Sequence, residues 1–66
     1  MIIRFKTHVN KNGNSYGLIV DTEKKLYKAG FSICAWNVDF YATKKDIEQF
    51  ITYNLKTNGF KPADEI

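Results

Sequence analysis

The residue types that most often carry out catalysis or bind metals are sparse in this chain. Its 66 residues include one histidine, His8, and one cysteine, Cys34. Nucleophilic catalysis requires a base held against the nucleophile, and a metal site requires several converging ligands. Neither residue has a partner at a typical spacing, and no P-loop, GxGxxG, HExxH or CxxC motif is present. The sequence therefore predicts a protein that is not an enzyme, with no catalytic residue, metal site or cofactor.

Basic residues form the pattern that points most clearly to a ligand. Six basic side chains are candidates for binding a ligand, four on one predicted sheet face and two at the start of the predicted helix: Arg4, Lys6, His8, Lys28, Lys44 and Lys45. The first three alternate along one strand, so they fall on the same face of a sheet. An open sheet face of this charge can contact phosphates, which predicts a module that binds DNA or RNA. The alternative is the solvated polar face that an antiparallel sheet normally presents.

Aromatic residues support a second class of function. Trp36, Tyr41 and Tyr53 are the candidates for exposed rings, because the other aromatic residues fall mostly on the predicted core face. Exposed rings can anchor a protein partner. The alternative prediction is therefore a small interaction or regulatory accessory protein, of phage or mobile-element type. Free sheet edges and a small core also favour a homodimer.

Charge is distributed unevenly along the chain. The formal net charge is +3, with 26% charged residues. Residues 1–45 hold eight Lys and Arg against three Asp and Glu, whereas residues 46–66 hold two against four. A net +5 in the first segment and −2 in the second favour a polyanionic or acidic partner for the first two thirds.

The expected compartment follows from the cysteine count and from the N-terminus. One cysteine cannot form an internal disulfide, which a secreted chain of this size would usually need. Met1-Ile2-Ile3 is followed at once by Arg4, without the apolar segment of a signal peptide. No apolar run approaches the roughly 20 residues of a membrane span. We therefore expect a soluble cytoplasmic protein without membrane association, forming one domain over residues 1–62 with a frayed tail over residues 63–66.

Two hairpins are predicted in the first half. Asn12-Gly13 is the residue pair that suits a two-residue type I′ turn, which pairs Phe5 with Val20 and Val9 with Tyr16. A polar four-residue loop over residues 22–25 then pairs Val20 with Tyr27. The predicted strands are residues 2–10, 14–21 and 26–34. Residues 36–42 suit a short fourth strand and an extended connector equally well.

A helix is predicted from about residue 44 to residue 58. Thr43 suits its N-cap, and Gly59-Phe60 suits a left-handed C-terminal cap that folds back on the helix. The helix has an apolar stripe formed by Ile47, Phe50, Ile51 and Leu55.

The combined prediction is an α+β fold in βββα order. It consists of a three-stranded antiparallel meander, with a short fourth strand as one option, packed on one C-terminal helix. The expected core contains Phe5, Val9, Leu18, Val20, Tyr27, Phe31, Ile47, Phe50, Ile51 and Leu55.

One stretch of the sequence resembles a known type of domain. Residues 40–46, Phe-Tyr-Ala-Thr-Lys-Lys-Asp, enter the helix after the predicted sheet. This arrangement resembles the arm-type DNA-binding domain of phage tyrosine recombinases, which has three strands and one helix and reads DNA with its sheet. The chain lacks the dense Arg and Lys content usual in those strands. The resemblance implies a fold and, by analogy only, DNA binding through the sheet.

Overall fold

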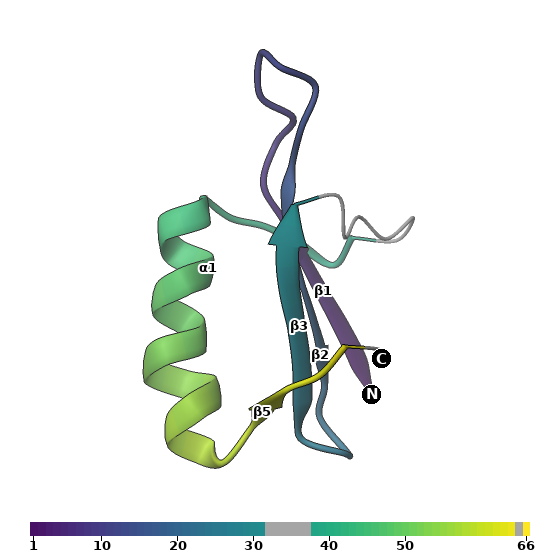
Figure 1. Cartoon of the computed structure of the whole chain (residues 1–66), viewed down its shortest axis with the longest axis vertical. Coiled ribbons are helices and arrows are strands. Elements are labelled where there is room, and N and C mark those ends of the chain that lie inside the picture. Colours follow the sequence, from purple (N-terminus) through teal and green to yellow (C-terminus); the bar gives the residue numbers. More distant parts are fainter. Residues whose placement is uncertain (32–37, 65) are drawn as a thin grey trace.

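The computed structural model describes residues 1–31, 38–64 and 66 (Figure 1). In this part of the chain, a mixed sheet of five strands lies beside one C-terminal helix. The strands are β1 (Ile2–Lys6), β2 (Tyr16–Asp21), β3 (Leu26–Phe31), β4 (Phe40–Tyr41) and β5 (Lys61–Pro62). Their order across the sheet is β4-β1-β2-β3-β5. The predicted α+β class and central meander are confirmed, but a purely antiparallel three-stranded sheet is wrong, because β4 and β5 add parallel pairs at its two edges.

The pairing of β2 with β3 has the predicted register. Val20 lies opposite Tyr27, and Leu18 lies opposite Ala29. The connecting loop has its expected four residues, and its last residue, Lys25, has a φ of +57°. The Asp21 Oδ1 atom accepts hydrogen bonds from the backbone N–H groups of Glu23 and Lys24. The aspartate thus forms the local turn that sequence chemistry favours at this position.

The first hairpin differs from its predicted register by two residues. Phe5 lies opposite Leu18 rather than Val20. Among the described residues, positive φ in this turn is confined to Gly13, at +79°, so the type I′ turn is wrong. The Gly13 N–H donates to the Asn10 carbonyl oxygen at 3.0 Å. Asn10 Oδ1 also accepts from the N–H groups of Asn12 and Asn14, and these bonds stabilise a longer loop.

The predicted faces are kept, because a shift of two residues preserves the alternation of side chains between the two faces of a strand pair. Thr7 is bonded to Tyr16 in two ways, because its N–H donates to the Tyr16 carbonyl and its Oγ1 accepts from the Tyr16 N–H. Between this pair and the Asn10–Asn14 pair, two residues of the first strand oppose one residue of the second. This extra residue forms a local bulge beyond the end of β1. The loop therefore extends past the sheet (Figure 1), and Val9 is 60% exposed instead of lying in the core.

Of the two readings of residues 36–42, the structure supports a short strand at Phe40–Tyr41. β4 runs parallel to β1, with Phe40 opposite Phe5. The Asp39 N–H donates to the Arg4 carbonyl at 2.9 Å, and Asp39 Oδ2 accepts from the Arg4 N–H at 2.9 Å. The Ala42 N–H donates to the Lys6 carbonyl. These bonds attach the connection before the helix to the free edge of β1.

The helix extends over the predicted range in three consecutive segments. They are α1 (Lys44–Phe50), a π-helical segment η1 (Ile51–Leu55) and a 3₁₀ segment η2 (Lys56–Asn58). The predicted N-cap is confirmed, because Thr43 Oγ1 accepts from the Asp46 N–H. The predicted C-terminal cap is also confirmed, since Gly59 has a φ of +84° and the Phe60 N–H donates to the Leu55 carbonyl. The π-helical segment, in which the Lys56 N–H donates to the Ile51 carbonyl, was not predicted.

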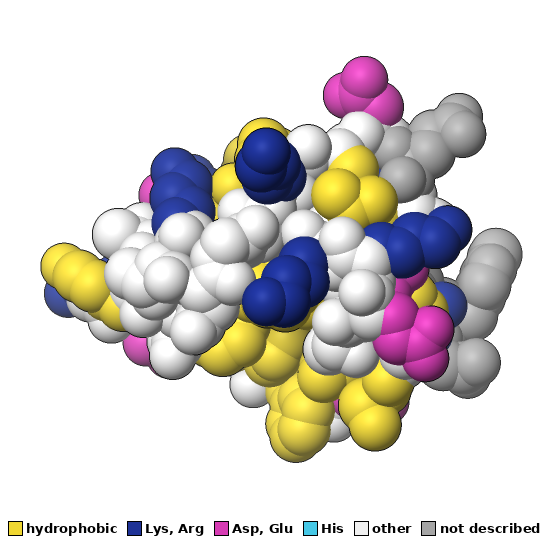
Figure 2. Space-filling model, turned by 90° about the horizontal axis from the view of Figure 1, so that it is seen from below, with side chains coloured by type: hydrophobic (Ala, Val, Ile, Leu, Met, Phe, Trp, Pro, Cys, Tyr) yellow, Lys and Arg dark blue, Asp and Glu magenta, His cyan; other side chains and the backbone are white. Residues whose placement is uncertain are grey.

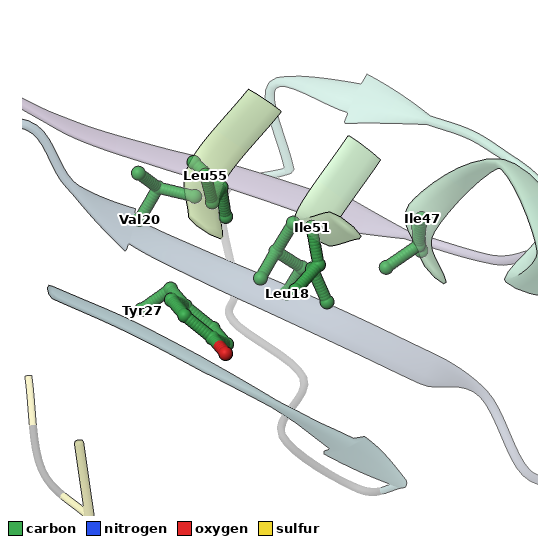
Figure 3. Packing of buried hydrophobic residues seen from close by; sticks show 6 residues of the cluster. All are labelled: Leu18, Val20, Tyr27, Ile47, Ile51 and Leu55. Carbon is green, nitrogen blue, oxygen red and sulfur yellow. The ribbon is translucent and has the colours of Figure 1, made fainter. Parts of the chain in front are cut away.

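The core lies between the helix and one face of the central strands (Figure 3). Its buried side chains are Leu18, Val20, Tyr27, Ile47, Ile51 and Leu55. All six were predicted, and two further predicted residues, Phe5 and Phe50, are half-buried against them. The prediction is wrong for Val9 and for Phe31, which is exposed at the end of β3. Burial of each large apolar side chain contributes about 1.5–3 kcal/mol, so this small core is the main source of stability.

The C-terminal segment is attached to the opposite edge of the sheet. The Lys61 N–H donates to the Lys25 carbonyl, and the Ala63 N–H donates to the Tyr27 carbonyl at 2.8 Å. The limits of the domain at residue 62 and of the tail at residues 63–66 stay predictions. Within the described ranges, no helix is long and apolar enough to cross a membrane.

Candidate functional site

The side of the sheet that faces away from the helix holds three of the six predicted basic site residues. We call it the outer face; β1, β2 and β3 contribute to it Ile2, Arg4, Lys6, Gly17, Ile19, Asp21, Leu26, Lys28 and Gly30. Arg4 and Lys28 are both opposite Ile19, from the two neighbouring strands. With strands about 4.8 Å apart, their backbones lie about 10 Å from each other. The two cationic groups thus stand on either side of an apolar residue.

The outer face is neither uniformly polar nor fully exposed. Ile2 and Leu26 lie opposite Asp21 at one end, and all three are half-buried. Arg4, Lys6 and Lys28 are also half-buried, and Gly17 is buried. The hydrogen bonds from the Lys24 and Glu23 N–H groups lower the pKa of the Asp21 carboxyl, which favours a negative charge at that end. Positive charge on this face is therefore concentrated toward Arg4 and Lys6.

His8 and Tyr41 form the most exposed part of this region. Their rings are stacked, with centroids 4.4 Å apart and planes inclined by 2°. Tyr41 is paired in register with Lys6, so both side chains lie on the outer-face side of the sheet. We call His8 and Tyr41 the ring pair. One predicted basic residue and one predicted partner-binding residue thus lie in contact, which sequence alone did not indicate.

A surface depression of about 520 Å³ adjoins the ring pair. Its lining comes from the end of β1, from β4 and from the start of the helix, and consists of Thr7, His8, Tyr41, Ala42, Thr43 and Asp46. Thr7 and Asp46 had not been assigned to a site. Thr7 is bonded to the backbone of Tyr16, and Thr43 to that of Asp46, so both hydroxyl groups are held in place by local structure.

Lys44 lies apart from the outer face. Its Nζ atom lies 5.3 Å from the ring centroid of Tyr16 and 5.6 Å from that of Phe31. It is also 3.9 Å from a carboxylate oxygen of Glu48. Tyr16 packs against the core, so Lys44 lies on the helix side of the sheet. Burial is the main cause that raises the pKa of the Tyr16 phenol, and the nearby Glu48 charge adds to it.

The remaining predicted site residues are separate from this region. Lys45 is exposed in the first turn of α1, and Tyr53 is 70% exposed on η1. Trp36 and Cys34 lie outside the described residues. Within residues 1–31, 38–64 and 66, no group of three or more His, Cys, Asp or Glu side chains is placed to hold a metal ion.

Figure 2 shows the molecule from the end that holds the β2–β3 turn. Lys and Arg side chains stand apart from one another in this view, some of them beside Asp or Glu side chains, while hydrophobic side chains gather along its lower edge. A second depression is lined by four apolar residues, Met1, Ile2, Ile3 and Phe40, and by Asp39. Both Met1 and Phe40 are exposed. The surface therefore offers an apolar area as well as the basic one.

Comparison with known proteins identifies no relative: no protein-family model, no curated protein and no solved structure matches the chain. The resemblance to arm-type DNA-binding domains stays an interpretation of residues 40–46. Any proposal of function must therefore start from the geometry of the surface.

Proposed function

We propose that this chain is a small non-enzymatic module that binds nucleic acid through Arg4, Lys6 and Lys28 on the outer face, together with His8. The observation that carries the proposal is the placement of Arg4, Lys6 and Lys28 on the sheet face that also carries the exposed ring pair. Phosphate contacts from Lys and Arg supply most of the affinity of sequence-independent binding. Exposed aromatic rings supply stacking surfaces for bases.

The proposal assigns different roles to the six predicted basic residues. Arg4 and Lys28 act as two phosphate contacts on either side of Ile19. Lys44 is engaged with Tyr16, Phe31 and Glu48, and therefore has a structural role at the helix start. Lys45 lies on the helix and contributes only to the long-range field.

The test is a salt titration of binding to labelled DNA and RNA. The parent is compared with an Arg4→Gln/Lys28→Gln variant and with a matched control, Lys45→Gln/Lys56→Gln. Both variants lose two positive charges, but the control residues are exposed on the helix. We expect the outer-face variant to reduce the salt slope by about 1.4–1.8, since each phosphate contact contributes about 0.7–0.9. Equal behaviour of the two variants would show that only net charge matters and would refute the proposal.

A second candidate function is a protein-interaction module. The observation that favours it is the depression lined by Met1, Ile2, Ile3, Asp39 and Phe40. Apolar exposed side chains of this kind often mark contact sites for proteins. Absence of any nucleic-acid binding at low salt, together with a partner whose capture is lost in a Phe40→Ala variant, would favour this candidate.

A further inference from the structure

The ring pair is a flat platform that tertiary structure assembles from distant parts of the sequence. The rings of His8 and Tyr41 are nearly parallel, with a 4.4 Å separation of centroids. Both residues are exposed, Tyr41 to 58%. Stacked aromatic rings that remain accessible to solvent present a π-face to an incoming planar group.

Backbone hydrogen bonds hold both members of the pair in position. β4 is attached to β1 by the bonds between Asp39 and Arg4 and by the bond from the Ala42 N–H to the Lys6 carbonyl. On the other side, Thr7 is bonded to Tyr16 through its N–H and its hydroxyl group. Because His8 follows Thr7 directly and Tyr41 precedes Ala42 directly, the platform is anchored beside both rings. Anchored rings lose little conformational freedom on binding, which favours affinity.

The residues that line the adjoining depression indicate which part of a nucleotide it could accept, the base or the phosphate. Its lining includes the acidic residue Asp46, together with Thr7, Thr43 and Ala42. A phosphate placed there would be repelled by the carboxylate, whereas an uncharged base would not. Basic residues lie instead on the outer face, where Lys6 is next to Tyr41 in register and Arg4 is two residues further along β1. The surface thus separates a region for a base from a region for phosphates.

We propose that the ligand is single-stranded nucleic acid, with one base stacked on the ring pair and the adjacent phosphates near Lys6 and Arg4. This inference rests on the proposed function and specifies its substrate class. Bases in a duplex are stacked on each other and cannot use the platform, so a duplex offers only its phosphates to this surface. Single strands should therefore bind more tightly than duplexes of the same length.

The experiment measures fluorescence anisotropy of labelled oligothymidylate and of a duplex of equal length, at low salt, with the full chain. The variants are Tyr41→Ala, Tyr41→Phe, which keeps the ring, and Tyr53→Ala as a matched control on the helix. We expect Tyr41→Ala to weaken single-strand binding by roughly 5- to 150-fold, the contribution of stacking by one base. Duplex binding should be unchanged, and the other two variants should bind single strands like the parent.

A measurement on the parent protein keeps the inference testable even if Tyr41→Ala disturbs the fold. Addition of oligothymidylate should move the NMR signals of the His8 and Tyr41 ring protons upfield, the direction produced by a base stacked on the rings, whereas the duplex should cause no upfield shift. If single strands and duplexes bind equally and Tyr41→Ala has no effect, the base platform is wrong while nucleic-acid binding itself survives. If the parent binds neither ligand at low salt, both the inference and the proposed function are refuted.

Discussion

Truncation of two valines provides a direct test of the first hairpin. Val20 is 3% exposed and packs in the core, whereas Val9 is 60% exposed beyond the end of β1. The predicted type I′ register would have placed both side chains in the core. Val20→Ala and Val9→Ala remove the same atoms, so the difference between them reports the environment of each side chain.

The expected magnitudes follow from burial. Val20→Ala removes two buried carbon groups at about 0.8 kcal/mol each and leaves a small cavity, so it should cost about 2–3 kcal/mol. Val9→Ala should change the free energy of unfolding by no more than about 0.5 kcal/mol, as is usual at exposed positions. In a domain of this size, the cost at Val20 corresponds to a loss of roughly 8–24 °C in Tm.

The assay is equilibrium unfolding in urea, followed by far-UV circular dichroism, with thermal melts as a second measurement. A domain of this length has a total stability of about 3–10 kcal/mol, so Val20→Ala should still fold at low temperature. An equal loss of stability in the two variants would refute the observed register and support the predicted one. An unchanged Tm for Val20→Ala would contradict the assignment of the core itself.

Three further changes test individual local features. Gly59→Val should lower the free energy of unfolding in urea by an amount on the order of 1–2 kcal/mol, because valine would be strained at a φ of +84°. A Cβ at this position would meet no atom within 4 Å, so steric overlap does not add to the cost. An unchanged urea midpoint would contradict the left-handed cap. Asp39→Ala should accelerate hydrogen exchange of the Arg4 backbone amide, because it removes the Oδ2 atom that accepts from this amide at 2.9 Å. Asp39→Asn keeps an acceptor oxygen and should preserve the protection. Equal exchange rates in the parent and both variants would argue against this hydrogen bond. Asp21→Asn tests pH dependence: folding lowers the pKa of this carboxyl below its ordinary 3.8, so its stabilisation is present at neutral pH and is lost as pH falls through the folded-state pKa. At low salt, the parent should therefore lose more stability than Asp21→Asn between about pH 5 and pH 2, and parallel pH profiles would contradict the shift.

The candidate site was only partly predictable. Alternation along the strands correctly assigned Arg4, Lys6 and Lys28 to the face away from the core, because side chains of a strand alternate whatever its partner. The contact between His8 and Tyr41 was not predictable. It depends on the parallel pairing of β4 with β1, and a two-residue strand has no periodicity that could indicate its neighbour. The separation of Lys44 from the basic face likewise depends on where the start of the helix meets Tyr16 and Phe31.

The sequence by itself determined the features that depend on neighbouring residues. Thr43 and Gly59 cap the helix through bonds within a few residues, and the Asp21 turn does the same for the second hairpin. Tertiary structure alone decided the covering of the sheet edges by β4 and β5. The register of the first hairpin depends on both levels: local bonds of the Asn10 side chain, together with the Thr7–Tyr16 pair nine residues apart, outweigh the intrinsic preference of Asn-Gly for a tight turn. At the two edges of the sheet, the hydrogen bonds join backbone groups, which every residue carries. Pairing of β4 and β5 therefore depends on the path that brings these segments beside β1 and β3, and not on their side chains.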